Sequence, residues 1–424
     1  MNDNLIIKTL RIRPFSYLML AEFFSQFSMN LFIFALLLVV FGVSNSSVAV
    51  SGVVLAFTLP SIFFGILAGV LVDRWDKKNV LLWTNILRAI IVFPLLVLYK
   101  DLVIVYLLTF TVSLVTQFFI PAETPMIPLL VDKKLLLSAN ALFGMGIYAS
   151  IFLAYASSGA ILYLVGRANI FLLLTVIFLL AAFFTSLIKY SNGKNEKMEI
   201  DVKSLSFRQE IKDVIDIISK TKSLYHALFS LTLAQILILV IAVIGPGYAK
   251  QVLSINIESF PLLFVTPAII GLALGAVIIG SYFHKVSKSL LTKFGMFLLG
   301  IAIVLLPYGS KVESREIIQD INLFLPQLFR INVLHIMVFL AFVLGFATAF
   351  VFVPANTILQ EETTDELRGK MYGVLNSLVG VLSILPVILV GGLADIFGVK
   401  SVITFVGLVV LVLAFIRTFV TDRE

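Results

Sequence analysis

Two ionisable residues, Glu22 and Arg88, lie inside long apolar stretches of the chain. A charged side chain within a membrane span is costly, so such a residue marks a candidate functional site. Counted from the same side, Glu22 lies about seven residues into its stretch and Arg88 about ten, or roughly 10 and 15 Å at 1.5 Å per residue. We therefore predict that Glu22 pairs with Arg88 and binds or releases a proton. A fixed ion pair that only braces the helices is the alternative.

Glu123 is a third candidate for proton coupling. It ends an apolar stretch that begins at Leu102, and it lies between Pro121 and Pro125. Because the stretch is just long enough to cross a membrane, its position favours a solvated helix end over a buried site.

Uncharged polar residues within the apolar stretches are candidates for lining a cavity. In membrane helices such side chains bond to a neighbouring helix about as often as they line a pore, so both roles stay open. These residues are Gln26, Asn30, Gln117, Gln235 and Asn376. The chain has no cysteine and only three histidines, far apart, so we expect no metal site, no cofactor and no thiol chemistry.

The stretch from Gly65 to Lys78, GILAGVLVDRWDKK, joins an apolar helix end to a charged turn. Gly65, Gly69 and Asp73 are spaced four apart, so they share one helix face. Small residues at this spacing let helix backbones approach closely in a membrane, and basic residues hold a turn on the cytoplasmic side. The basic residues of this turn are Arg74, Lys77 and Lys78.

The composition predicts an all-α polytopic membrane protein. Hydrophobic residues make up 60% of the chain and charged residues 13%, against roughly one half and one quarter in soluble domains. The mean hydropathy is +1.09. Dividing the chain at its polar breaks gives twelve stretches long enough to cross about 30 Å of hydrocarbon. They are 15–42, 47–72, 79–99, 102–123, 138–165, 168–189, 224–249, 258–283, 290–308, 331–358, 371–394 and 400–418.

The distribution of positive charge predicts the orientation of these spans. With the N-terminus in the cytoplasm, 23 of the 31 Lys and Arg residues fall in the inner segments and 7 in the outer ones. This bias fits the positive-inside rule with both termini cytoplasmic, in a plasma (bacterial inner) membrane. Topology thus accounts for the net charge of +7, and we expect no binding of nucleic acid.

The only long polar stretch in the middle of the chain separates six spans from six. It contains apolar residues at helical spacing, from Phe207 to Ile218, which predicts an amphipathic helix along the inner membrane surface. The expected organisation is a cytoplasmic N-terminus, an N-terminal bundle of six helices, a linker, a C-terminal bundle of six helices and a cytoplasmic tail. The corresponding ranges are 1–14, 15–189, 190–223, 224–418 and 419–424.

An internal repeat relates the two halves. The segment PAETPMIPLL from Pro121 pairs with PANTILQEET from Pro354, and Gly271 and Gly275 correspond to Gly65 and Gly69. The second copy lacks the Asp-Arg pair that ends the first. The repeat predicts two related bundles with a substrate site between them.

These motifs resemble those of the major facilitator superfamily of transporters. The resemblance is carried by GILAGVLVDRWDKK, by PAETPMIPLLVDKKLLLSANA and by ELRGK around Arg368, in the order found in the branch of macrolide and enterobactin exporters. It implies a pseudo-symmetric fold and transport by alternating access. It also implies a gate in which Asp73 faces the start of span eleven, near Arg368, in the outward-open state.

The expected function is therefore secondary active transport, namely proton-coupled efflux of a small amphipathic compound of the drug or siderophore type. The expected partners are that substrate, protons and membrane lipid, and the chain is expected to act as a monomer. Lysophospholipid flippases of the same superfamily share part of the pattern, so a lipid cargo is one alternative. A non-transporting sensor or scaffold is another. No paired aspartates or zinc site that a membrane enzyme would need appear in the spans, so we expect no enzyme.

Overall fold

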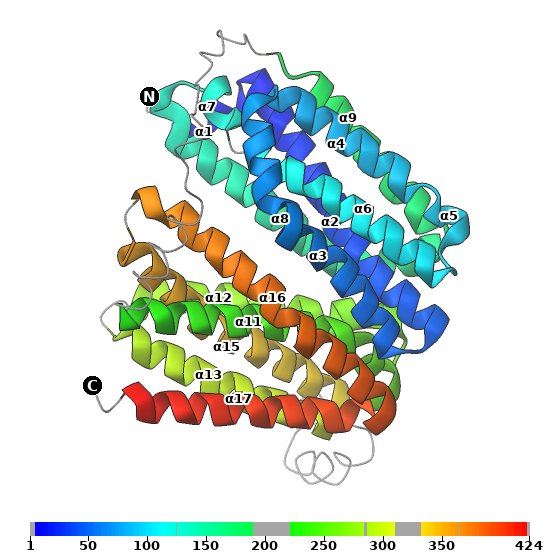
Figure 1. Cartoon of the computed structure of the whole chain (residues 1–424), viewed down its shortest axis with the longest axis vertical. Coiled ribbons are helices and arrows are strands. Elements are labelled where there is room, and N and C mark those ends of the chain that lie inside the picture. Colours follow the sequence, from blue (N-terminus) through cyan, green and yellow to red (C-terminus); the bar gives the residue numbers. More distant parts are fainter. Residues whose placement is uncertain are drawn as a thin grey trace. The chain divides into compact units, whose positions relative to one another are not determined.

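The computed structural model of the chain describes residues 5–123, 125–189, 221–283, 286–309, 332–363 and 365–421. All regular structure within these ranges is helical (Figure 1). Twelve of the described segments are long and apolar enough to cross a membrane, which confirms the predicted number of spans. The predicted amphipathic helix of the linker lies outside the described residues.

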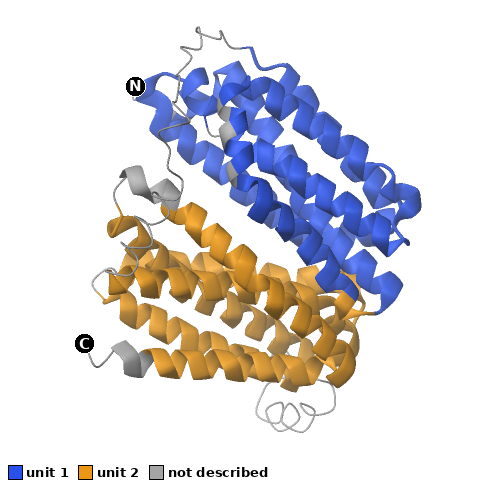
Figure 2. Cartoon of the chain, in the orientation of Figure 1, with its two compact units in different colours: residues 1–45, 49–196 blue, residues 46–48, 197–424 orange. Residues whose placement is uncertain are grey.

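The chain forms two compact units, coloured separately in Figure 2. Unit 1 comprises residues 1–45 and 49–196, and unit 2 comprises residues 46–48 and 197–424. Each unit contains six of the apolar spans. The predicted ends of the linker stay a prediction, because residues 190–220 are outside the described ranges.

Unit 1 is built from long helices joined by short turns. Its helices are α1 (Leu5–Leu10), α2 (Arg13–Ser44), α3 (Ser47–Arg74), α4 (Lys77–Val92), α5 (Leu95–Leu98), α6 (Leu102–Glu123), α7 (Met126–Leu130), η1 (Lys133–Leu135), α8 (Leu136–Val165) and α9 (Asn169–Ser186). Two of the long helices end at residues with positive φ, Asn45 after α2 and Gly166 after α8. Asn45 adopts the left-handed helical conformation, a common way to stop a helix. Gly166, with φ 87° and ψ 162°, leaves the helix in an extended conformation of positive φ that favours glycine.

Unit 2 repeats the pattern with two π-helical turns in addition. Its helices are α11 (Lys222–Gly247), η2 (Tyr248–Val252), η3 (Ile257–Ser259), η4 (Pro261–Val265), α12 (Thr266–Tyr282), α13 (Lys288–Leu305), η5 (Leu306–Gly309), α15 (Val333–Glu361), α16 (Asp365–Phe397) and α17 (Val399–Thr421). The π-helical turns are η2 and η4, at the end of span seven and the start of span eight.

The two units pack equivalent helices in the same way. In unit 1, α4 (span three) packs against α9 (span six) and α6 (span four). In unit 2, α13 (span nine) packs against α17 (span twelve) and α15 (span ten). The repeat predicted from Pro121 and Pro354 is therefore present in the folded chain.

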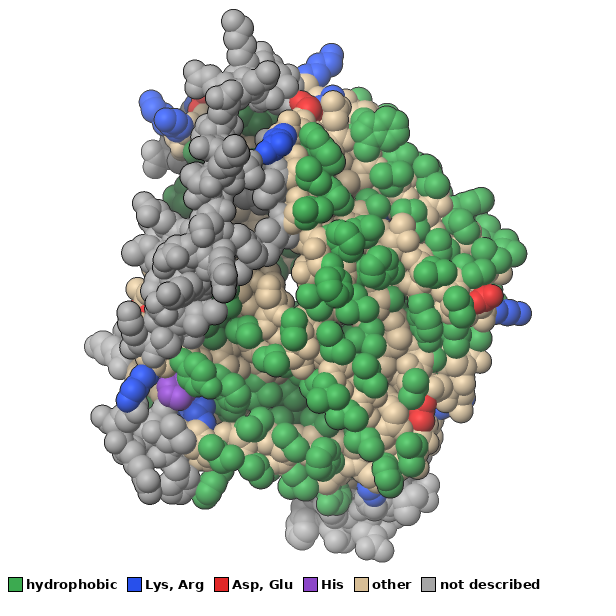
Figure 3. All heavy atoms as spheres, viewed as in Figure 1, with side chains coloured by type: hydrophobic (Ala, Val, Ile, Leu, Met, Phe, Trp, Pro, Cys, Tyr) green, Lys and Arg blue, Asp and Glu red, His purple; other side chains and the backbone are tan. Residues whose placement is uncertain are grey.

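The surface of the described residues is strongly apolar. In the face drawn in Figure 3, hydrophobic side chains cover most of the described surface, and charged side chains are few. Large apolar residues such as Phe63, Tyr163 and Ile396 have 68%, 76% and 74% of their surface exposed. A soluble protein rarely exposes so much continuous apolar surface, whereas hydrocarbon solvates it readily. The chain is an integral membrane protein.

Candidate functional site

Three ionisable side chains are buried together in unit 1. Glu22 comes from α2, Arg88 from α4 and Glu123 from the last residue of α6, and their exposed fractions are 2%, 1% and 7%. All three lie within the candidate membrane spans. Because a buried charge is costly unless other groups compensate it, such a cluster is a strong candidate for a functional site.

Arg88 is held by polar groups and aromatic rings. Its Nη1 donates to Ser25 Oγ at 2.9 Å and lies 3.5 Å from Asn85 Oδ1. Its guanidinium carbon lies 4.4 Å from the centre of the Phe119 ring and 5.9 Å from that of Phe178. Rings at these distances attract a cation through their negative faces, more strongly where water is excluded.

Ser25, on α2, bridges Arg88 and Asn85, which both lie on α4. The Ser25 hydroxyl donates to Asn85 Oδ1 at 2.9 Å while it accepts the hydrogen bond from Arg88. The amide of Asn85 donates to the carbonyl of Leu81, one turn earlier. Both residues are almost completely buried, with exposed fractions of 1% and 0%. They fix the guanidinium in one place, and neither was identified from the sequence.

The carboxyl group of Glu22 interacts with that of Glu123 and with the side chain of Gln26. One oxygen of each carboxyl group, Glu22 Oε1 and Glu123 Oε2, is buried without a hydrogen-bond partner. Arg88 interacts electrostatically with both carboxyl groups. The structure therefore places Glu22, Arg88 and Glu123 in one buried cluster, and the predicted direct pairing of Glu22 with Arg88 stays a prediction.

The interpretation of Glu123 as a solvated helix end is wrong, because its side chain is 93% buried by the described residues. The physical reason lies in the residues that follow it. Helical structure resumes one turn later as α7, Met126–Leu130, whose Met126 and Ile127 are buried in the core of the unit. The prolines around Glu123 thus mark an interruption within the bundle and not its edge.

The candidate cavity residues fall into two groups. In unit 1, Gln26 contacts Glu22, Asn30 donates to the Gln26 carbonyl at 2.8 Å, and Gln117 donates to the Ser113 carbonyl at 3.2 Å. In unit 2, Gln235 is half-buried on α11 and Asn376 is exposed on α16. Gln26 therefore adjoins the ionisable cluster, and Asn30 lies one turn further along α2.

The predicted gate residues are partly described. Arg74 is exposed, and Lys77 Nζ donates to the Val72 carbonyl at 2.6 Å, which closes the turn after α3. Lys78 is half-buried at the start of α4. The side chains of Asp73 and Arg368 lie outside the described residues.

Asp76 has a role that the sequence comparison with the exporter motif did not identify. Its side chain accepts a hydrogen bond from the backbone N–H of Asn79 at 2.8 Å, which caps α4. Asp is among the best residues for this position. Asp76 therefore helps to set where α4, the helix that carries Arg88, begins.

The glycines of the two repeats are packed differently. A methyl group added at Gly271 would lie 2.0 Å from the Phe342 carbonyl oxygen, because α12 and α15 are in backbone contact there. At Gly65 the nearest atom would be Gln117 Oε1 at 3.6 Å, and at Gly69 nothing would lie within 4 Å. The first glycine face is therefore left open within unit 1.

A second buried guanidinium belongs to Arg417 in unit 2. Its exposed fraction is 5%, and its Nη1 donates to Ser230 Oγ and lies 3.1 Å from Met296 Sδ. Ser230 belongs to α11 and Met296 to α13, so the side chain of Arg417 on α17 is buried among three helices of unit 2.

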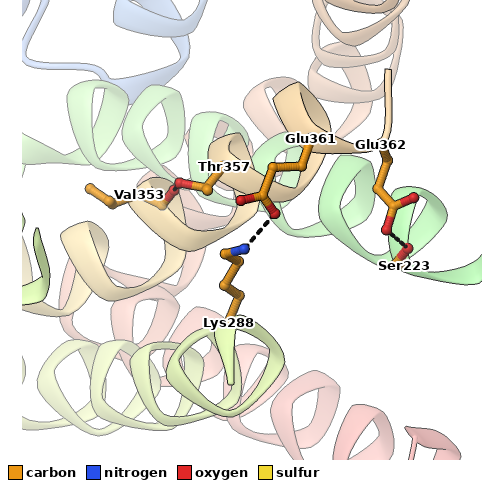
Figure 4. A network of polar contacts seen from close by, with 6 residues as sticks. All are labelled: Ser223, Lys288, Val353, Thr357, Glu361 and Glu362. Atoms are coloured by element: carbon orange, nitrogen blue, oxygen red, sulfur yellow. Dashed lines mark hydrogen bonds and ion pairs between the residues drawn. The ribbon is translucent and has the colours of Figure 1, made fainter. Parts of the chain in front are cut away.

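One end of unit 2 is tied by polar contacts, drawn in Figure 4. Lys288 at the start of α13 forms an ion pair with Glu361 at the end of α15. Ser223 at the start of α11 donates to Glu362 at 2.8 Å. These helix ends belong to segments that the charge distribution assigns to the same side of the membrane. Within the described part of the chain no group of acidic residues and histidines could hold a metal ion.

Comparison with known proteins agrees with this structure. The sequence model of the Major Facilitator Superfamily matches residues 18–316 and 321–424. The chain is 22% identical to macrolide efflux protein A of Streptococcus pyogenes over 387 residues, which is 89% of each chain. It is 26% identical to the putative bacilysin exporter BacE of Bacillus subtilis over 336 residues, 78% of this chain and 76% of that one.

Among solved structures, the fold is similar to that of the nucleoside transporter NupG, with a TM-score of 0.74 and 12% identity. The match covers 96% of this chain and 98% of the other. At this identity the likeness shows the fold alone. Family, fold and twelve apolar spans are those of a transporter and not of an enzyme, and the resemblance carried by the Gly65–Lys78 stretch is confirmed. The chain belongs to the Major Facilitator Superfamily of membrane transporters.

Proposed function

We propose that this transporter exports a small amphipathic compound and that a proton gradient drives the export. The observation that carries the proposal is the buried cluster of Glu22, Arg88 and Glu123. Two carboxyl groups inside membrane spans can bind and release a proton, and a gradient can do work only through a group that changes its protonation. Export as the direction is supported by the printed names of two relatives, a macrolide efflux protein and a putative bacilysin exporter.

The mechanism we propose is alternating access, with the transporter acting as a monomer. Asp73 and the glycine face formed by Gly65 and Gly69 serve as the cytoplasmic gate. The open surroundings of these glycines support this role, because the equivalent glycines of the second repeat are already used for packing inside their own unit. Asp73→Asn should reduce transport and leave membrane insertion intact; unchanged transport would contradict the gate.

We place the protein in the plasma (bacterial inner) membrane with both termini in the cytoplasm. The uneven distribution of Lys and Arg supports this orientation. It assigns the helix ends joined by Lys288 and Glu361 to the cytoplasmic side, and these ends do lie together in unit 2.

The test is transport by the purified protein in vesicles with an imposed pH gradient. The probes are a radiolabelled macrolide and a lysophospholipid, added singly. We expect macrolide flux that depends on the pH gradient and that Glu22→Gln reduces at least tenfold. Glu362→Gln, at an exposed carboxylate outside the cluster, should transport like the unchanged protein.

The other outcomes each overturn a stated part of the proposal. Flux of the lysophospholipid alone would identify a lipid flippase. Flux that ignores the pH gradient, or that survives Glu22→Gln unchanged, would contradict proton coupling. No flux of any probe, from protein that is folded and correctly inserted, would favour a sensor or scaffold.

A further inference from the structure

The carboxylate of Asp395, in the last turn of α16, caps a helix other than its own. It accepts hydrogen bonds from three groups at the start of α3. These are the Ser46 hydroxyl, the backbone N–H of Ser47 at 2.7 Å and the backbone N–H of Val48 at 3.2 Å. The first N–H groups of a helix have no partner within that helix, and its N-terminus attracts negative charge. Asp395 therefore stabilises the first turn of α3 from a distant part of the chain.

The capped turn, residues 46–48, groups with unit 2, so these hydrogen bonds lie within unit 2 (Figure 2). The chain before and after it, residues 1–45 and 49–196, forms unit 1. Helix α2 ends at Ser44, so only Asn45 and Ser46 connect it to α3. A connection of two residues leaves little slack. Whatever holds the first turn of α3 therefore also holds the end of α2.

The sequence around Asp395 repeats the spacing of residues around Asp73. A glycine, Gly391, precedes Asp395 by four residues and Lys400 follows it by five. Gly69 and Lys78 have the same spacing from Asp73. The distribution of Lys and Arg assigns the end of span two to the cytoplasmic side and the end of span eleven to the outer side. The same spacing therefore occurs at opposite sides of the membrane.

The position of Asp395 allows its hydrogen bonds to break and form again. Its side chain is exposed, so water can replace the three donors when they leave. A fully buried carboxylate would instead lose its partners at a high cost in free energy. Alternating access requires the helices that close one side of the membrane to separate. A contact that joins two spans at the outer side therefore has to open in each cycle.

We propose that Asp395 is a gate residue at the outer side of the membrane. Its carboxylate holds the start of α3 while that side is closed and releases it when that side opens. This inference rests on the proposed function, in which transport occurs by alternating access. It adds a second gate to the one proposed at Asp73, at the opposite ends of the same two spans. Removal of the Asp395 carboxylate should therefore favour the state that is open to the outside.

The test measures how fast a maleimide labels a cysteine at position 47 in the purified, full-length protein. The chain has no cysteine of its own, and the Ser47 side chain is completely buried. Ser47→Cys changes only one atom of the side chain and keeps the backbone N–H that binds Asp395. We expect slow labelling in this variant. Combined with Asp395→Ala, labelling should be about tenfold faster, because hydrogen bonds to a charged group stabilise the closed state by roughly this factor.

A matched control separates the gate from the loss of any helix cap. Asp101 also accepts hydrogen bonds from free N–H groups, those of Val103 at 3.0 Å and Ile104 at 3.2 Å, but it caps α6, the helix that directly follows it. Asp101→Ala should leave the labelling of Ser47→Cys unchanged. Asp395→Asn keeps the shape of the side chain and removes its charge, so labelling should be faster in this variant too. Thermal melting of each variant verifies that the protein is folded before its rate is compared.

An unchanged rate in both Asp395 variants would overturn the gate, and so would an equal increase in Asp101→Ala. No labelling at all with Asp395 in place would overturn the release, because the contact would then be permanent. These results need neither substrate nor a pH gradient, so they are separate from the transport assay. Faster labelling without pH-driven flux would support the outer contact and refute the proposed function, whereas pH-driven flux with an unchanged rate would refute the gate alone.

Discussion

Arg88 carries its charge in a place where water hardly reaches it, and the cost of that burial has to be offset nearby. Ser25 and Asn85 supply oxygen atoms at 2.9 and 3.5 Å, and Phe119 lies against the guanidinium at 4.4 Å. A neutral hydrogen-bond partner and an aromatic face each offset only part of the desolvation of a guanidinium. The buried carboxyl groups of Glu22 and Glu123 supply further compensation, because both interact electrostatically with Arg88. Under the proposed function, the stability of unit 1 and its proton binding are therefore linked through one side chain.

Ser25→Ala should destabilise the protein by about 1–3 kcal/mol, because it removes the closest hydrogen-bond acceptor of a buried cation. The measurement is thermal unfolding of the purified protein. The matched control is Ser61→Ala, whose hydroxyl is exposed and bonds only to the Thr58 carbonyl of its own helix. The control should change stability by less than about 0.5 kcal/mol. Equal effects of the two substitutions would contradict the role assigned to Ser25.

The residues of the buried cluster around Arg88 differ in how readily the sequence alone predicts them. Glu22 and Arg88 could be predicted, because a charge in the middle of an apolar stretch is conspicuous and its depth follows from helix geometry. Glu123 could be placed only by knowing that the chain continues into the core after its prolines. Ser25 and Asn85 could not be identified, because serine and asparagine in membrane helices bond either to their own backbone or to a neighbouring helix, and the residue type does not signal which.

At the scale of helices, glycines spaced four apart produce a flat helix face. The spacing does not determine which other helix packs against that face. Gly65–Gly69 and Gly271–Gly275 have the same spacing, yet only the second pair lies in backbone contact with another helix of its own unit. Helix α15, which packs against Gly271 of α12, also has a glycine at the contact, Gly345. A methyl group added to Gly345 would lie 1.7 Å from the Ala268 carbonyl oxygen of α12. Close approach of α12 and α15 thus depends on glycines in both helices. The number of spans was predictable from the polar breaks in the sequence and the repeat from its matching motifs, whereas this difference in glycine packing was not.

Gly271→Ala should destabilise the protein by about 1–3 kcal/mol or more, because the methyl group meets a carbonyl oxygen that cannot move without separating α12 from α15. The equivalent substitution in the first repeat, Gly65→Ala, meets only the end of the Gln117 side chain. It should leave stability unchanged or raise it by up to about 1 kcal/mol through better helix propensity. Thermal unfolding of both variants decides the matter, and a loss of stability in Gly65→Ala as large as in Gly271→Ala would refute the difference.

Asp76→Ala should cost about 0.5–2 kcal/mol, because it removes the side-chain oxygen that satisfies the free N–H of Asn79 at the start of α4. Asp76→Asn keeps an acceptor in the same place and should retain most of the stability. The two variants are compared by thermal unfolding. If Asp76→Asn were as destabilised as Asp76→Ala, the negative charge and not the cap would be responsible.

At the scale of the whole molecule, the distribution of basic residues predicts the orientation of the chain across the membrane. Lys100 precedes α6 and Lys134 follows α7, so the two lysines lie at opposite ends of span four, and both are exposed. The positive-inside rule places Lys134 in the cytoplasm and Lys100 outside. The orientation matters for the proposed gate, because it assigns the turn after Gly65 and Gly69 to the cytoplasmic face.

The chain lends itself to a direct test of this direction, because it contains no cysteine of its own. In intact cells, a membrane-impermeant thiol reagent should label Lys100→Cys and leave Lys134→Cys unlabelled. After permeabilisation both variants should be labelled to the same extent, since the exposed positions are equally accessible once the membrane barrier is removed. Labelling of Lys134→Cys alone in intact cells would reverse the orientation. Both termini would then lie outside the cell, and the distribution of Lys and Arg would not follow the positive-inside rule in this chain.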